Sequence, residues 1–145
     1  LVFTVQEELG CRGAKAAAER LNPDIGIAVD ITPAHDYPCD LEGSNTLGEG
    51  GGIKISDPSV ICDEYLVDEM VKCCKENNIK YQFDVIAKGG TDASSINLSN
   101  YGVRACGITV ATRYPHGPNS MVNMDDVEAA VKLLSRYVSR EFKFE

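Results

Sequence analysis

The sequence predicts an α/β fold, a three-layer sandwich in which helices cover both faces of a mixed, largely parallel sheet. Two observations favour it: helix and strand patterns alternate along the chain, and several of the strand patterns are strongly apolar. The chain has 145 residues, 43% of them hydrophobic and 25% charged, which suits one ordinary globular domain.

The first half of the chain is expected to contain three strands and a helix. The apolar run 1–5 predicts a strand, and the segment 10–24 predicts a helix that stops at Asn22-Pro23. The residues expected on the buried stripe of this helix are Ala14, Ala17, Ala18 and Leu21. The nearly continuous apolar run 25–31 is typical of a strand buried on both faces. A long loop over 33–52 and a short alternating strand over 53–56 follow.

The second half is expected to contain two long helices and two strands. Asp63 is a plausible N-cap for a helix over 64–77, and Asn123 for the last helix. The segments 81–87 and 103–111 read as strands, separated by a glycine-rich turn and a short helix. The expected buried side is Leu66, Val67, Met70 and Cys74 in the first long helix, and Val127, Val131, Leu134 and Val138 in the last.

Composition excludes several functional classes. The net charge is −8, and Lys and Arg are scattered, so neither nucleic acid nor an anionic membrane is an expected partner. No apolar run reaches the length of a bilayer span. Six cysteines occur without a CxxC pair, which favours reduced cysteines that pack in the interior of a cytosolic protein.

Acids and a histidine follow four of the predicted strands. In open α/β sheets, ligands bind at the carboxyl ends of strands. Applying this rule brings together the pair Glu7-Glu8, Asp30, the stretch 88–92 and the stretch 113–116. The sequence therefore indicates one shared site at one edge of the sheet.

The two adjacent glutamates cannot do the same job, because neighbouring side chains on a strand or tight turn point in different directions. One would bind a metal ion and the other would act as general base on a water. Asp30 and His116 offer the oxygen and nitrogen donors expected for Zn, Co or Mn.

Plainer interpretations stay open. Glu7 and Glu8 could be solvated acids at a helix N-terminus, and His116 could be an ordinary surface residue. The stretch GGTDAS (89–94) could bind an anion or simply form a tight turn that closes the pocket floor.

Four segments resemble one family. They are TVQEELGCRGAKAAA, IGIAVDIT, GGTDASSINLS and TRYPHGPNSMVNMDDVEAAVKLL, in the family's order and spread over nearly the whole chain. They resemble the cytosolic dinuclear metallo-aminopeptidases, a family with tetrahedral, glutamyl and leucyl aminopeptidases and some members described as endoglucanases. The resemblance implies a zinc-peptidase-like fold, a peptide substrate, a cytoplasmic location and a homo-oligomer.

The resemblance also implies roles for individual residues. Glu7 falls on the general base, and Glu8, Asp30 and His116 fall on ligands of two divalent metal ions, Zn, Co or Mn. Candidates for lining the pocket or supporting the ligands are Lys88, Thr91, Asp92 and Arg113.

The family's complete site also needs a His and a bridging Asp that precede the QEE motif, and its dimerisation domain lies upstream as well. We therefore expect residues 1–145 to be the C-terminal part of a catalytic domain, with little or no activity alone.

Three alternatives remain. In an endoglucanase-type glycoside hydrolase, Glu7 and Asp30 would be the carboxylate pair, which His116 and the absence of Trp disfavour. A non-catalytic binding or assembly module and an anion-binding protein are the other two.

Overall fold

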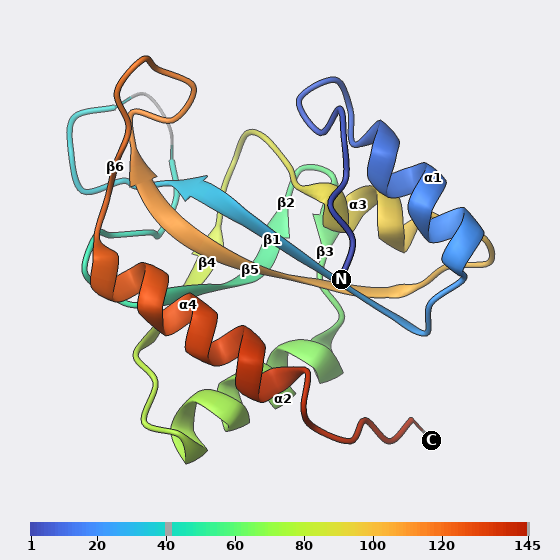
Figure 1. Ribbon diagram of the computed structural model, residues 1–145. Coiled ribbons are helices and arrows are strands. Elements are labelled where there is room, and N and C mark those ends of the chain that lie inside the picture. Colours follow the sequence, from blue (N-terminus) through green and yellow to red (C-terminus); the bar gives the residue numbers. More distant parts are fainter. Residues whose placement is uncertain (40–41, 145) are drawn as a thin grey trace.

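A computed structural model describes residues 1–39 and 42–144, and its chain forms three layers (Figure 1). The helices are α1 (Arg12–Leu21), α2 (Glu64–Glu76), α3 (Asp92–Asn97) and α4 (Met124–Tyr137). The strands are β1 (Ile25–Pro33), β2 (Gly51–Asp57), β3 (Val60–Ile61), β4 (Tyr81–Val85), β5 (Arg104–Arg113) and β6 (Met121–Val122). The two-residue strands β3 and β6 carry no sequence signal of their own.

The sheet is mixed, as expected. β1 pairs with β5 in parallel, β5 pairs with β2 antiparallel, and β2 pairs with β4 in parallel. β4 therefore runs opposite to β5. The short strand β3 pairs antiparallel with β2, and the short strand β6 pairs antiparallel with β5.

Alternation along β5 shows how the layers are separated. Cys106 and Ile108 belong to a large buried cluster with residues of α2 and α4, whereas Ala105 packs in a smaller cluster with Ala93 of α3. Successive side chains of a strand point to opposite faces, so α2 and α4 cover one face and α3 covers the other. α1 packs beside α3.

Helices α2 and α4 begin at the predicted caps. The Asp63 carboxylate accepts a hydrogen bond from the Leu66 N–H (3.1 Å), and the Asn123 side chain accepts one from the Asp125 N–H (2.8 Å). α1 ends at Asn22, whose left-handed backbone (φ 47°) precedes Pro23. The side chains of Asp63 and Asn123 therefore determine where α2 and α4 start.

The prediction of a strand over residues 1–5 is wrong. This segment pairs with no strand in the described part of the chain, and Phe3 is 88% exposed. The chain instead turns back onto the start of α1, where the Val5 carbonyl accepts the Gly13 N–H (2.9 Å). A Cβ on Gly13 would lie 2.4 Å from that carbonyl oxygen, so the turn requires glycine.

The buried stripe predicted for α4 is wrong at two of its four positions, whereas Val127 and Leu134 are half-buried. Val131 and Val138 are exposed, and the buried residues are Asp126, Ala129, Ala130, Leu133 and Tyr137. Polar anchors decide the rotation of the helix. Asp126 accepts the Gly48 and Gly50 N–H groups (2.7 Å each), and the Tyr137 hydroxyl donates to the Leu66 carbonyl (2.8 Å).

β1 is not buried on both faces as predicted. It is the end strand of the described sheet, and Val29 and Ile31 are 57% and 44% exposed. By alternation with Ala28, these two side chains lie on the face that α2 and α4 cover, at a point these helices do not reach.

Candidate functional site

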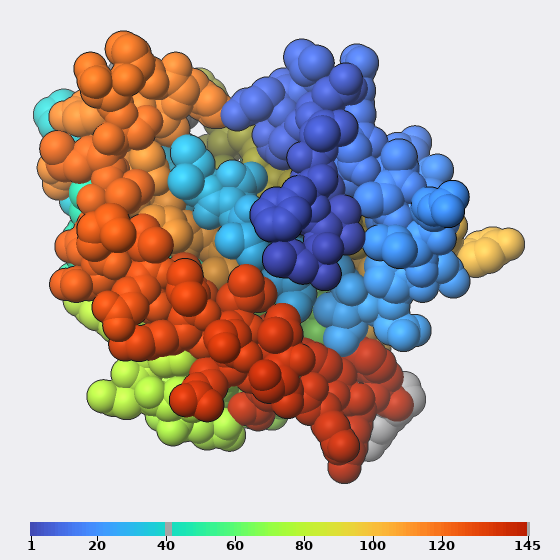
Figure 2. Space-filling view, in the orientation of Figure 1, coloured from blue at the N-terminus to red at the C-terminus, as the bar shows by residue number. Residues whose placement is uncertain are grey.

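A cavity of about 720 Å³ brings most of the predicted site residues together. Its lining includes Glu7, Glu8, Asp30, Lys88, Thr91 and His116. Figure 2 shows the surface hollowed between the early part of the chain (blue) and the segment that follows β5 (orange). Residues far apart in the sequence therefore share one pocket.

A tight turn before α1 holds the two glutamates. The Glu7 carbonyl accepts the N–H groups of Gly10 (2.9 Å) and Cys11 (2.8 Å). Gln6 and Cys11 both have left-handed backbones (φ 60° and 53°), an unfavourable state for residues with a Cβ. Such strain is often found at functional sites, where surrounding contacts maintain it.

Glu7 points into a cluster of other acids. Its Oε1 accepts a weak hydrogen bond from the Cys11 thiol (3.6 Å). Burial, and then the charge of Asp30, raise the pKa of Glu7. A carboxylate with a raised pKa is better able to take up a proton near neutral pH, which suits a general base.

Glu8 faces the opposite way and meets His116. Glu8 Oε1 lies 3.5 Å from His116 Nδ1, and both side chains are largely exposed. Two ligands of one tetrahedral zinc ion, at bond lengths of about 2.1 Å, lie about 3.4 Å apart. This pair therefore fits one divalent metal ion with almost no movement.

Asp30 lies on β1, opposite Thr109 of β5. The backbone N–H of the next residue, Ile31, donates a hydrogen bond to Asp30 Oδ1 (2.7 Å). Burial raises the pKa of Asp30. Its carboxylate does not form a compact set with Glu8 and His116. In the described part of the chain, the donor set that meets a 4.8 Å limit is Glu7, Cys11 and Asp92.

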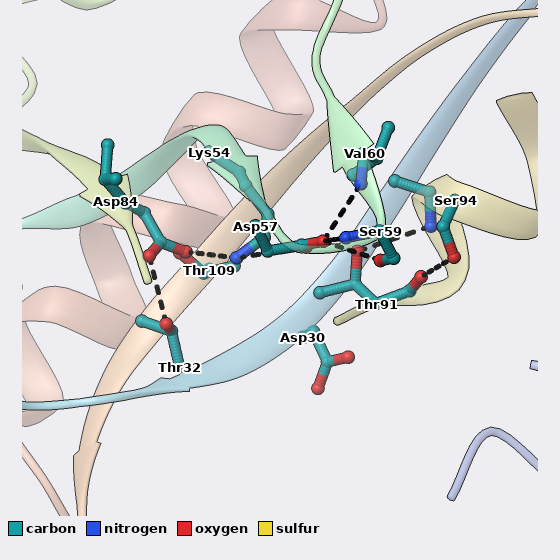
Figure 3. A network of polar contacts seen from close by, with 12 residues as sticks. Asp30, Thr32, Lys54, Asp57, Ser59, Val60, Asp84, Thr91, Ser94 and Thr109 are labelled. Carbon is teal, nitrogen blue, oxygen red and sulfur yellow. Dashed lines mark hydrogen bonds and ion pairs between the residues drawn. The ribbon is translucent and has the colours of Figure 1, made fainter. Parts of the chain in front are cut away.

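A buried charge network lies beside Asp30 (Figure 3). Lys54 of β2 has no exposed surface, and its Nζ lies 3.0 Å from Asp84 Oδ2 and 3.7 Å from Asp57 Oδ2. Asp84 also accepts hydrogen bonds from three neutral side chains, those of Thr32, Asn45 and Thr109. This network was not predicted from the sequence, although a lysine within the apolar stretch GGIKI was a usable signal.

The four residues predicted to line or support the site differ in position. Lys88 is exposed on the cavity wall, and Thr91 is buried and caps α3 by accepting the Ala93 N–H. Asp92 Oδ2 accepts the Thr4 hydroxyl (2.6 Å). Arg113 is outside the cavity lining and forms a two-point ion pair with Asp36 (3.0 and 2.7 Å).

The rule that located the site holds only in part. β1 and β5 are parallel and end at the same edge of the sheet, but β4 runs the other way and residues 1–5 are not a strand. The stretch 88–91, which leads from β4 into α3, nevertheless lines the cavity. The site thus lies over one face of the sheet as well as at its edge.

Most of the cysteines are buried, as predicted. Cys11, Cys62, Cys73, Cys74 and Cys106 are buried free thiols. Within the described residues, each helix is too short or too polar to cross a bilayer.

A three-layer α/β fold with carboxylates and a histidine around one pocket defines the class of this protein. Residues 1–133 match the M42 glutamyl aminopeptidase family, and the chain belongs to that family.

Individual relatives agree with this assignment. The glutamyl aminopeptidase of Lactococcus lactis subsp. cremoris is 37% identical over 135 residues, which cover 93% of this chain and 37% of the relative. The aminopeptidase APDkam598 of the archaeon Desulfurococcus kamchatkensis superimposes with a TM-score of 0.85 at 38% identity, covering 93% of this chain and 39% of that one. The chain thus spans about two fifths of the length of the relatives it matches.

Two further solved structures bear on assembly and on activity. The TET1 peptidase of Pyrococcus horikoshii, described as assembling into a tetrahedron or a large octahedral shell, has a TM-score of 0.80 at 31% identity, with 97% of this chain and 40% of that one covered. A Thermotoga maritima protein described as an endoglucanase has a TM-score of 0.66 at 29% identity, with 94% of this chain and 41% of that one covered.

Proposed function

We propose that this chain contributes part of the active site of a metal-dependent aminopeptidase, which removes N-terminal residues from peptides. One observation supports this most directly. Two adjacent glutamates face different partners in one cavity, Glu8 toward His116 and Glu7 toward the half-buried Asp30 and Asp92.

Glu7 is the proposed general base. It would take a proton from the attacking water and return it to the leaving amine of the peptide. Glu8 and His116 would hold a divalent metal ion, Zn, Co or Mn, and Asp30 would hold the second ion. When bound, the ions would polarise the scissile carbonyl and lower the pKa of the water.

Glu8, Asp30 and His116 provide fewer ligands than two four-coordinate ions require. We therefore propose that the remaining ligands lie outside these 145 residues, and that this chain alone has little or no peptidase activity. The other surrounding residues would shape the pocket: Lys88 on its wall, and Thr91 and Asp92 at the start of α3. Arg113 would act at a distance, through its ion pair with Asp36.

A homo-oligomer and a cytoplasmic location are proposed with this activity. The first is supported by the assemblies described for the TET1 relative. The second is supported by the buried free thiols, because reducing compartments keep cysteines in that state.

The decisive test is Glu7→Gln in a protein that carries this chain with a complete site. We expect kcat on aminoacyl chromogenic substrates to fall by about 10²- to 10⁴-fold, because general base catalysis is lost. Metal bound through Glu8, Asp30 and His116 should be retained, because the substitution leaves these three ligands untouched. Full activity in the Glu7→Gln variant would contradict the assignment of the base.

The similarity to a Thermotoga maritima protein described as an endoglucanase supports a second candidate function. Hydrolysis of a cellulose oligomer should be compared with that of a glutamyl or leucyl substrate by the same preparation. Cellulose cleavage without peptidase activity, insensitive to chelators, would favour Glu7 and Asp30 as a glycosidase pair.

A further inference from the structure

A second group of metal-binding donors lies beside the proposed catalytic pair. One donor atom each from Glu7, Cys11 and Asp92 comes within 4.8 Å of both others. Two of these residues belong to the turn before α1, and the third begins α3, 81 positions further along than Cys11.

The sulfur and one oxygen already have the spacing of metal ligands. Cys11 Sγ lies 3.6 Å from Glu7 Oε1. For tetrahedral zinc, with bond lengths of about 2.3 Å to sulfur and 2.1 Å to oxygen, these two ligands would lie about 3.6 Å apart. Cys11 Sγ and Glu7 Oε1 could therefore bind one zinc ion without moving relative to each other.

Asp92 supplies an independent observation. Its Oδ2 accepts the Thr4 hydroxyl at 2.6 Å, which holds the carboxylate in place. Its Oδ1 is buried and has no hydrogen-bond partner among the described residues. Buried carboxylate oxygens are seldom left unpaired, and a cation at the cluster would satisfy this one.

The charges around the cluster also favour a cation. Two carboxylates, those of Glu7 and Asp92, lie together in the cluster. The N-terminus of α1 contributes about half a positive charge, which is smaller than the two negative charges. Lys54, the buried cation nearby, is already paired with Asp84.

The cluster can be reached from solvent. Cys11 and Glu7 both line the 720 Å³ cavity, although Cys11 itself is only 9% exposed. An ion that enters the cavity would meet the thiol and the Glu7 carboxylate from the open side.

We propose that Glu7, Cys11 and Asp92 form a binding site for a thiophilic divalent cation of the class of Zn²⁺ and Cd²⁺, separate from the Glu8–His116 pair. On binding, a metal–sulfur bond forms, the S–H bond breaks and the proton passes to solvent, with no change of oxidation state. The remaining coordination positions are taken by water.

Occupation of this site would regulate the enzyme. This consequence, unlike the site itself, rests on the proposed function. A cation held by the Glu7 carboxylate removes the lone pairs that the base needs, so excess zinc or cadmium would inhibit.

The test is a titration of the 145-residue chain with Cd²⁺ alone, followed by the cadmium–thiolate charge-transfer absorption in the ultraviolet. The chain carries Cys39→Ser throughout, because that cysteine is exposed and would add its own signal. We expect the band to reach the intensity of one cadmium–thiolate bond per chain, and Cys11→Ser to abolish it. Glu7→Gln and Asp92→Asn should each weaken binding by at least about tenfold, since even residues that only support metal ligands have effects of that size.

Two controls separate this site from the others. Asp36→Asn removes an acid outside the cluster and should leave the titration unchanged. His116→Ala removes the partner of Glu8 and should also leave the band, so a failure of the proposed catalytic metal site would not be mistaken for a failure of this one.

Three results would overturn the proposal. They are a band that survives Cys11→Ser, a band lost in His116→Ala, and unchanged affinity in both Glu7→Gln and Asp92→Asn, which would indicate a solitary thiol. If circular dichroism shows that Cys11→Ser does not fold, the cadmium affinities of Glu7→Gln and Asp92→Asn decide whether the proposed site exists.

Discussion

Neighbouring residues of the same type have different surroundings in this protein. Glu7 and Glu8 are adjacent, yet Glu7 lies beside Cys11 and Asp92 whereas Glu8 lies 3.5 Å from His116. The left-handed backbone at Gln6, just before them, sets the direction in which the pair leaves the chain. The pKa of Glu7 is raised by burial, so the surroundings rather than the residue type assign the role.

The ion pair between Asp36 and Arg113 leads to a prediction of pH dependence. Hydrogen bonds from Arg113 hold the pKa of Asp36 below its ordinary value of 3.8. A lowered carboxyl pKa stabilises the folded state above the unfolded value, and this contribution is lost as the pH falls through the folded pKa.

We therefore expect Asp36→Asn to lower the midpoint of thermal unfolding at pH 7, and the difference from the parent chain to shrink as the pH falls below 3.8. Calorimetry across this range measures it. Asp68→Asn, at an exposed position of α2, is the matched control and should have no such effect. A difference that stays constant down to low pH would show that the ion pair is not its source.

At the scale of elements, local caps determine where a helix begins, and long-range hydrogen bonds determine which face it buries. Caps such as Asp63 and Asn123 set where helices begin. The face that α4 buries is set instead by Asp126 and Tyr137, whose partners lie 76 to 78 and 71 positions away. These anchors prevail over a valine stripe with good helical spacing.

Asn123→Ala tests the contribution of one cap. The Asp125 N–H would lose its acceptor, so we expect the free energy of unfolding to fall by about 1 kcal/mol. Urea denaturation measures the change. Asn123→Asp keeps an acceptor oxygen and should retain most of the stability, whereas equal losses in both variants would mean that the side chain acts in another way.

At the scale of the whole molecule, one buried charge network ties the sheet together. Asp84 of β4 binds Lys54 of β2, Thr32 of β1 and Thr109 of β5. Thr32 lies two positions after Asp30 on β1, and both Asp30 and Lys54 line the cavity. The network therefore connects the strands of the sheet to the cavity wall.

Lys54→Met should therefore destabilise the chain by about 3–5 kcal/mol, because it leaves Asp84 buried without its counter-charge. A loss of that size is a large part of the about 5–15 kcal/mol that holds a typical domain folded. Chemical denaturation followed by circular dichroism measures it. Lys72→Met removes an exposed lysine paired with Glu69 and should change little; equal effects of the two substitutions would contradict the role of burial.

The sequence by itself determined the features that depend on near neighbours. The α/β class, the presence of four helices, the caps of α2 and α4, the four longer strands and most of the residues proposed for the site followed from periodicity, capping residues and motifs. Each of these signals acts within a few positions of the chain.

Only the tertiary structure decided which distant groups meet. It reversed β4 relative to β5, rotated α4 away from its valine stripe and left residues 1–5 outside the sheet. It also joined Lys54 to Asp84 across 30 positions, and Thr4 to Asp92 across 88, which brought Asp92 to Glu7 and Cys11. The physical reason is that packing and buried charge pairing depend on residues far apart in the sequence. The spacing of residues within one helix or strand does not indicate which distant residues will meet.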